Sequence, residues 1–442
     1  MTRTLACLAA LIAALPATSL RLAEAAAQDT SRVNEGVRVG LEYQPGVRPG
    51  LVVLPGPGLD SVRAIVRRDL DYSDRFEMLD AGTAPATGGA TGTINYGIYK
   101  LMQAAFAVEF SEGAGGVTAR LHDVAASKVR NQQAFALPPV TDGGFRLEVH
   151  RMSDEIARWA IGTAGIAASR LLFVSGGRIY RIDSDGVDLV PLTPAGQTSL
   201  SPSWAADGRQ FAYTQLGEGR GGVLIEDLST GALSPVPGTQ SGLNITPAFS
   251  PDGKTIAYAH SDETGTDIFT ANYTDRCCAQ RLTVGRYADN LSATFSPDGR
   301  RIAFVSTRAG PPQVYVMAAD GTYQELLAPF DFGATGASNA PEWSPDGANV
   351  AFHREVDRSQ QLFIVDVAGR RLRQLTSAGR NEDATWAPDG RHLAFVSDRS
   401  GVRQLWIIDV ETGRVRQVHT PGAARLPSWS RRLGRTAAAS NP

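Results

Sequence analysis

The sequence predicts a two-domain fold, in which an N-terminal α/β domain precedes a six-bladed all-β propeller. A segment of 43 to 48 residues recurs through the second half of the chain, and this is the length of a four-stranded propeller blade. Residues before 165 lack this repeat and alternate strand-like with helix-like runs. The expected organisation is a signal peptide at 1–27, an extended segment at 28–40, the α/β domain at 41–165, the propeller at 170–433 and a tail at 434–442.

The composition is that of a globular protein and excludes a nucleic-acid partner. The chain has 442 residues, of which 43% are apolar and 20% are charged. Lys and Arg together number 43 and Asp and Glu number 45, so the formal net charge is −2. A nucleic-acid-binding domain normally carries a clear excess of basic residues, which this chain does not have.

The first residues have the pattern of a secretory signal peptide. Arg3 precedes an apolar run from Leu5 to Leu15, and the alanines at 25–27 offer cleavage sites before Gln28. The alternative is a retained membrane anchor, but the run is shorter than the roughly 20 residues that a spanning helix needs. We therefore expect cleavage near Gln28, export of the chain and no membrane span in the mature protein.

The first domain begins with a predicted strand–helix–strand unit. Residues 51–54 form an apolar run, and Asp60 is expected to cap a helix that ends near Ser73 and is followed by a strand at 75–79. A short helix at 96–102, a hairpin of strands at 105–110 and 117–121, and a closing helix complete the domain. The closing helix has one apolar face, formed by Val149, Met152, Ile156 and Trp159.

The propeller repeat is marked by an aromatic residue at the end of the first strand of each unit. These aromatic residues are Trp204, Phe249, Phe295, Trp343, Trp386 and Trp429. An Asp-Gly turn follows the first five, and each turn leads into three further strands. Such an Asp usually bonds its own backbone and such a Gly accepts positive φ, so we interpret the repeated Asp as turn residues and not as catalytic acids.

The two ends of the repeat predict how the propeller closes. Residues 171–192 supply the last three strands of a blade, whereas 426–430 supply a first strand with no followers. Joining them in one sheet covers edges that an open array would expose. The expected number of blades is therefore six.

Neither cysteine nor histidine spacing indicates catalysis or metal binding. After cleavage only Cys277 and Cys278 remain, and we expect either two inert thiols or an incidental bond on a surface loop. The six histidines, at 122, 150, 260, 353, 392 and 419, show no His-Glu-x-x-His spacing. We therefore expect no catalytic residue, no metal site and no cofactor.

The residues resemble the TolB family of the Tol-Pal envelope system over nearly all of the mature chain. The resemblance in the first domain is carried by Ser73-Asp74-Arg75-Phe76, and at the domain junction by His150 with Asp154-Glu155-Ile156. The closing Pro427-Ser428-Trp429-Ser430 is also similar to the family. The stretch at 56–58 is shorter than the usual loop there, and the Cys277-Cys278 pair is not a family feature.

The resemblance implies a non-enzymatic periplasmic adaptor, monomeric, that supports outer-membrane integrity and cell division. It implies binding of the lipoprotein Pal at the mouth of the propeller channel and of TolA through the N-terminal segment. The expected Pal contacts lie in loops that enter the first strand of each blade: Leu200, Asn244, Thr246, Asn290, Ser292, Asn339 and Glu382. The expected TolA segment contains Val33, Val37 and Val39, which can pair as an added strand.

Alternatives remain at each of these points. Asn in such loops can simply favour the turn, and the N-terminal segment can be a frayed end. An exported propeller enzyme or a small-molecule or glycan sensor could use the same channel. A peptidase of the prolyl oligopeptidase type is disfavoured, because no Gly-x-Ser-x-Gly motif occurs in the chain.

Overall fold

The computed structural model describes residues 48–434, except 83–86, 89–92, 114–115, 218–219, 286–287 and 329–335. The predicted signal peptide, the segment at 28–40 with Val33, Val37 and Val39, and residues 435–442 lie outside the described residues. The described residues form an N-terminal α/β part followed by a β-propeller. None of their helices is both long enough and apolar enough to cross a membrane.

The α/β part is built on a five-stranded sheet of order β2-β1-β5-β6-β7. Its strands are β1 (Gly50–Val53), β2 (Glu77–Leu79), β5 (Ala104–Gly113), β6 (Gly116–Asp123) and β7 (Lys128–Ala136). Strand β1 pairs in parallel with both β2 and β5, and the remaining pairs are antiparallel. A two-stranded sheet of β3 (Thr87–Gly88) and β4 (Thr93–Ile94) lies between β2 and α2 in the chain.

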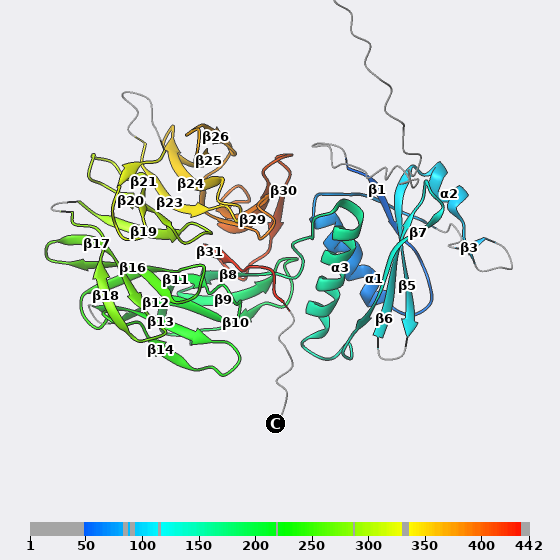
Figure 1. The fold of residues 1–442 in the computed structure, drawn as a ribbon, viewed down its shortest axis with the longest axis horizontal. Helices are drawn as coiled ribbons and strands as arrows, with labels where there is room; N and C mark the ends of the chain where they lie inside the picture. Colours follow the sequence, from blue (N-terminus) through cyan, green and yellow to red (C-terminus); the bar gives the residue numbers. More distant parts are fainter. Residues whose placement is uncertain are drawn as a thin grey trace, which may run out of the picture. The chain divides into compact units, whose positions relative to one another are not determined.

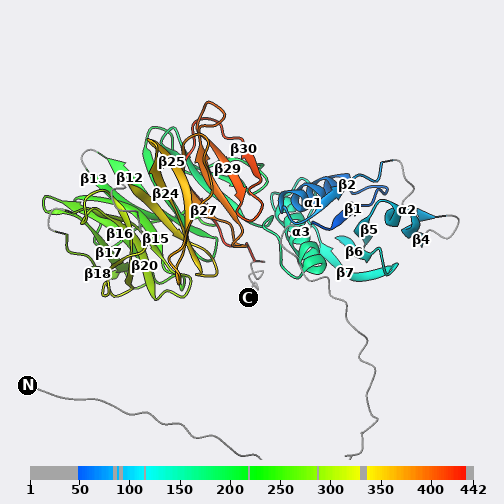
Figure 2. The ribbon, with the colours of Figure 1, turned by 90° about the horizontal axis from the view of Figure 1, so that it is seen from above.

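Two helices cover one face of this sheet. Helices α1 (Asp60–Tyr72) and α3 (Phe145–Ile161) lie side by side in both views (Figures 1 and 2). Their buried apolar residues, including Val66 and Ile156, pack with Phe106 of the sheet in one core. On the other face, Tyr99 of α2 (Tyr96–Leu101) packs against Val52.

The structure corrects one detail of the predicted first helix and adds a strand. The residue preceding the helix is Leu59, in the left-handed region with φ 55°, whereas Asp60 begins the helix and pairs with Arg63. An acidic residue in the first turn is favourable toward the helix dipole, so Asp60 still stabilises this end. Strand β7 is mostly polar and exposed, which is why apolar alternation gives no sign of it.

The propeller consists of antiparallel runs of strands. The first sheet contains β8 (Arg170–Ser175), β9 (Arg178–Asp183), β10 (Val190–Pro191) and the C-terminal β31 (Arg425–Trp429). An eight-stranded sheet follows: β11 (Thr198–Trp204), β12 (Gln210–Gly217), β13 (Arg220–Asp227), β14 (Leu233–Pro235), β15 (Leu243–Phe249), β16 (Thr255–Asp262), β17 (Gly265–Asn272) and β18 (Cys277–Arg281). Its two antiparallel runs, β11–β14 and β15–β18, are joined by one parallel pair, Gly221 with Leu243.

Three further four-stranded sheets complete the described propeller. They are β19 (Asn290–Phe295) to β22 (Glu325–Leu326), β23 (Ser338–Trp343) to β26 (Leu372–Gln374), and β27 (Asn381–Trp386) to β30 (Val415–Val418). The strands between these are β20 (Arg301–Ser306), β21 (Gln313–Ala318), β24 (Asn349–Val356), β25 (Ser359–Asp366), β28 (His392–Ser397) and β29 (Gln404–Asp409).

The predicted closure and the predicted turns are confirmed. Strand β31 pairs with β8, with Trp429 opposite Leu171. In the turns, Asp298 Oδ1 accepts the backbone N–H of Arg300, and Gly299 has φ 71°. Asp252, Asp346 and Asp389 bond their own turns in the same way. A disulfide joins Cys277 and Cys278 in β18.

Candidate functional site

A cavity of about 700 Å³ lies where the first strands of the propeller runs meet, and we call it the channel. Its walls come from strands far apart in the sequence, namely β11, β15, β19, β23, β27 and β31. Each of these strands carries the repeated aromatic residue at its end. The repeat thus brings equivalent positions of every run to one cavity.

The same backbone irregularity recurs at the channel wall in each of these strands. The residues concerned have positive φ and line the channel: Ser201 (49°), Thr246 (52°), Ser292 (54°), Ala340 (49°), Asp383 (54°) and Leu426 (50°). Each lies at a shift in strand register, such as that between Leu200 and Ser203. A bulge of this kind locally redirects the strand, and the repeat places it at the equivalent channel-lining position of every first strand.

Two residues further along, three of the equivalent side chains connect one first strand to the next. Ser428 Oγ accepts the backbone N–H of Trp204 (3.3 Å), and Thr385 Oγ1 accepts that of Trp429 (3.0 Å). At the equivalent position Glu342 Oε1 accepts the N–H of Trp386 (3.0 Å) and the hydroxyl of Thr385 (2.9 Å). Glu342 also lines the channel.

Two of the expected partner contacts, Asn244 and Asn290, are fully buried. Asn244 Nδ2 donates to the carbonyl oxygens of Gly221 and Ser241, both at 2.8 Å. Asn290 Nδ2 donates to Asp267 Oδ1 (3.0 Å), and its Oδ1 accepts from Arg308 (3.0 Å). These amides hold the loops that lead into the first strands. The sequence left open that Asn at these positions serves the loop and not a partner, and the buried amides agree with that alternative.

The other expected contacts are nearer to the surface. Thr246 and Ser292 line the channel, and the N–H of Ser292 donates to Thr246 Oγ1 (3.3 Å). Leu200, Asn339 and Glu382 are partly exposed. Each directly precedes one of the channel residues with positive φ. Glu382 pairs with Arg380 at 2.6 Å and with Arg403 at 3.5 Å. Partner binding at all of these residues stays a prediction.

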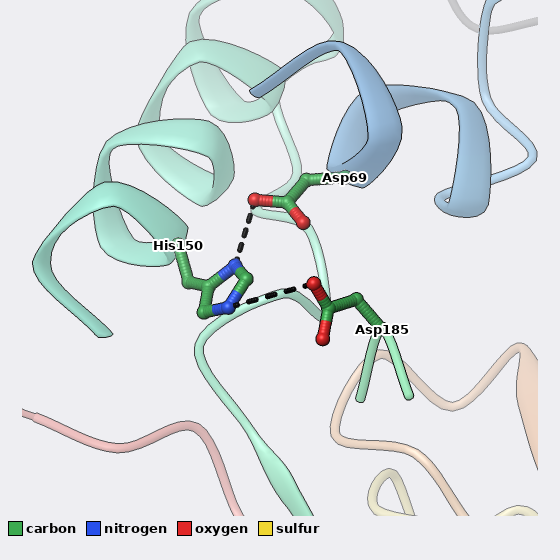
Figure 3. Close-up of side chains that lie close together, drawn as sticks. All are labelled: Asp69, His150 and Asp185. Atoms are coloured by element: carbon green, nitrogen blue, oxygen red, sulfur yellow. Dashed lines mark hydrogen bonds and ion pairs between the residues drawn. The ribbon is translucent and has the colours of Figure 1, made fainter. Parts of the chain in front are cut away.

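A second group of polar residues joins α1 and α3 to the first propeller sheet (Figure 3). His150 of α3 is fully buried, and its Nδ1 lies 2.8 Å from Asp69 Oδ2 of α1. Its Nε2 lies 3.7 Å from Asp183, the last residue of β9, and 3.9 Å from Asp185, which follows that strand. Burial lowers the pKa of His150, but the charge of Asp69 and the hydrogen bonds of Asp183 and Asp69 outweigh it and raise the pKa to about 10.

A similar group involves the last propeller sheet. His392 Nδ1 lies 2.8 Å from Asp389, and its Nε2 lies 3.4 Å from Asp74, just after α1. Burial lowers the pKa of His392, but the charge and hydrogen bond of Asp389 outweigh it and raise the pKa to about 9. Both histidines are therefore cationic at neutral pH and neutralise buried carboxylates.

The geometry of these two groups would allow a metal ion, but arginines already occupy their carboxylates. Three ligand atoms, one each from Asp69, His150 and Asp185, lie within 4.8 Å of one another. However, Asp185 forms ion pairs with Arg68 and with Arg146. In the second group, of Asp74, His392 and Asp409, the carboxylate of Asp409 likewise pairs with Arg391. We interpret both groups as structural ion-pair networks.

Sequence reasoning missed the channel residue Glu342, and it did not single out Asp383 within the expected loop at 381–383. Burial raises the pKa of Glu342 to about 7, although the N–H of Trp386 and the hydroxyl of Thr385 oppose the shift. Burial also raises the pKa of Asp383. The signal in the sequence was a break in the repeat. The other first strands carry Ser, Ala or Thr at the position equivalent to Glu342, and none of them carries an acidic residue at the position equivalent to Asp383.

Comparison with known proteins places the propeller in one family. A family model described as the TolB beta propeller domain matches residues 161–329 and 332–440. Among curated proteins, the chain is similar to the Tol-Pal system protein TolB of Francisella tularensis subsp. mediasiatica (strain FSC147). The two are 29% identical over 251 residues, which are 53% of this chain and 55% of that protein. The chain thus spans about half the length of the curated relatives it matches.

Solved structures show the same fold. A crystal structure of TolB from Acinetobacter baumannii matches with a TM-score of 0.76 and 22% identity, over 88% of this chain and 98% of that chain. Hydrazine synthase of Kuenenia stuttgartiensis matches with a TM-score of 0.51 and 15% identity, over 60% of this chain and 47% of that chain. At these identities the likeness concerns the fold and says nothing of a shared activity.

Proposed function

Since the chain belongs to the TolB β-propeller domain family, we propose that it is a non-enzymatic periplasmic component of the Tol-Pal envelope system. The observation that carries this proposal is the match of the TolB beta propeller domain model to residues 161–329 and 332–440, together with the 29% identity to a Tol-Pal system protein TolB. In this function the protein is an adaptor that supports outer-membrane integrity and cell division. The predicted signal peptide, at 1–27, supports the periplasmic location.

The channel mouth is the proposed binding site for Pal. Thr246 and Ser292 would contact the partner directly, because both line the cavity. Leu200, Asn339 and Glu382 would contribute from the loops beside it, where they are partly exposed. Asn244 and Asn290 would act indirectly, by holding these loops in a binding conformation, since their amides are buried and bonded within the chain.

The N-terminal segment at 28–40 is the proposed binding site for TolA. Val33, Val37 and Val39 alternate with polar residues and glycine, which suits pairing as an added strand. If Pal binding changes how this segment packs, each partner would alter the affinity of the other by the same coupling free energy. Deleting residues 28–39 should then change the affinity for both partners, and unchanged affinities would contradict the proposal.

We also propose that the propeller has six blades. In this interpretation the eight-stranded sheet is two blades, β11–β14 and β15–β18, because a single parallel residue pair joins its two antiparallel runs. The sheet that contains β31 would then be the blade that closes the ring.

The test is a calorimetric titration with the periplasmic domain of Pal from the same genome. We expect saturable 1:1 binding that is at least tenfold weaker, about 1.4 kcal/mol, in the Asn244→Ala, Asn290→Ala double variant. Asn272→Ala is the matched control, because Asn272 bonds a turn at Asp275 and does not line the channel. Absence of binding by the unmodified protein at high micromolar concentration would overturn the proposed function.

A further inference from the structure

Glu342 breaks the repeat inside the channel. The equivalent residues of the other first strands are Ser203, Ala248, Thr294, Thr385 and Ser428. Thr385 and Ser428 show that a single hydroxyl is enough to accept the backbone N–H of the next sheet. Glu342 makes the same connection with Oε1 alone, so joining the sheets does not explain its second oxygen or its charge.

The second carboxylate oxygen of Glu342 has no partner within the described residues. Glu342 lines the channel, and its Oε2 accepts no hydrogen bond from any residue that the structure describes. In that part of the chain no Lys, Arg or His forms an ion pair with Glu342. Glu342 is partly exposed, so this oxygen is accessible from the channel. A carboxylate in a cavity wall without a paired cation attracts positively charged groups, and the low-dielectric walls of a cleft strengthen that attraction.

None of the described residues that line the channel forms an ion pair with Glu342. Asp383, two residues before Thr385, adds a second carboxylate to the wall, and its Oδ2 accepts the N–H of Leu426 at 3.3 Å. His353 Nδ1 accepts the N–H of Asp383 (3.1 Å), and burial lowers the pKa of His353, so this ring is neutral beside Asp383. Two arginines also line the channel. Arg432 is bonded to Gly165 and paired with Asp154, whereas the exposed Arg431 forms no ion pair with a described residue, Glu342 and Asp383 included.

We propose that the channel binds a primary ammonium or guanidinium group, with Glu342 as its main anionic contact and Asp383 as a second. The volume of about 700 Å³ accommodates a long basic side chain or a small diamine. Hydroxyl groups of Thr246 and Ser292 in the same wall can accept further hydrogen bonds from such a group. The cationic group can belong to a free diamine or to a lysine or arginine of a protein partner. The second source rests on the proposed function.

The experiment compares Glu342→Gln and Glu342→Thr with the unmodified protein. Gln keeps an oxygen that can accept from Trp386 and Thr385, and Thr restores the hydroxyl that other strands carry, so both variants should fold. Glu355→Gln is the matched control, because Glu355 is an exposed acid of the same sheet that does not line the channel. One arm titrates cadaverine at constant ionic strength, and the other titrates the Pal domain.

In the cadaverine arm, we expect saturable binding that weakens at least tenfold in both Glu342 variants and is unchanged in Glu355→Gln. In the Pal arm, an equal loss of affinity for Pal in the same two variants would indicate that the cationic group belongs to a side chain of Pal. Binding of Pal and cadaverine that is the same in all four proteins would overturn the inference. A rise in melting temperature with calcium chloride alone, absent in both Glu342 variants, would also overturn it in favour of a metal site.

If Pal does not bind the unmodified protein, the proposed function fails, while the cadaverine arm still tests the channel on its own. If Pal binds and both Glu342 variants bind Pal and cadaverine normally, only the cation inference fails. The two failures are thus distinguishable.

Discussion

Two regions of the molecule contain carboxylates whose charge is handled differently. One is the contact of α1 and α3 with the propeller, and the other is the wall of the channel. At the first region, Asp69, Asp183 and Asp389 each face a cationic histidine. In the channel, Glu342 forms no ion pair with any described residue. Charges that the chain balances itself serve the fold, whereas a charge left unbalanced in a cavity indicates a site for a ligand.

The largest expected effect comes from breaking a balanced group. Asp69→Ala leaves the buried cationic His150 without its nearest carboxylate and Ser153 with only the carbonyl oxygen of Val149 as an acceptor. We expect a loss of about 3–5 kcal/mol in the free energy of unfolding, measured by urea titration. Asp60→Ala is the control, because its carboxylate is 93% exposed and its pair with Arg63 contributes little. Equal losses in the two variants would contradict this assignment.

The pH dependence of stability sharpens the same contrast. The pKa values of His150 and His392 are raised to about 10 and about 9 from an unfolded value of 6.5. Their contribution is therefore fully present below pH 6.5 and is lost as the pH rises through 9 to 10, a change on the order of 3 kcal/mol for each histidine between pH 7 and pH 10. Urea titrations at pH 7 and pH 10 should show this loss, and Asp69→Ala should show a smaller one. A stability that rises toward pH 10 would contradict the prediction.

A smaller effect is expected from a neutral buried group at the loops beside the channel. Asn381 Nδ2 donates to Gln361 (2.9 Å) and to the carbonyl of Ala378 (3.1 Å), and its Oδ1 accepts from Arg399 (2.8 Å). Asn381→Ala should cost about 1–3 kcal/mol because these groups lose their partner. Asn339→Ala, whose side chain has no hydrogen bond with the described residues, should leave the melting temperature nearly unchanged.

The smallest expected effect has the opposite sign. The pKa of Glu342 is raised to about 7, so ionising this carboxyl in the folded state disfavours folding above its unfolded pKa. Glu342→Gln should therefore stabilise the protein by about 1 kcal/mol at pH 8 and have little effect at pH 4, where the carboxyl is protonated. Thermal unfolding at the two pH values measures this difference. Destabilisation at pH 8 would indicate that the charge is balanced after all.

Much of the fold could be predicted because its signals are local and repeated. The aromatic and Asp-Gly positions predict the turns and the order of strands, and the pairing of β31 with β8 follows from the incomplete units at the two ends. Strand β7 could not be predicted, because most of its residues are exposed and polar and its place depends on pairing with β6.

The candidate site was less accessible to sequence reasoning. Asn244 and Asn290 occupy the expected loops, but only the structure shows that their amides are buried and bonded within the chain. The partner of His150 is Asp69, 81 positions earlier, and nothing in the spacing of the two residues indicates the contact.

By itself, the sequence determined the α/β part, the repeat of the propeller, its turns and the break in the repeat at Glu342. These features depend on side-chain periodicity and on the backbone preferences of Asp, Gly and Pro, which act over a few residues. The tertiary structure alone decided which charges are balanced. Whether a carboxylate is paired depends on elements far apart in the chain, such as α1 with β9, and on how completely their packing excludes water.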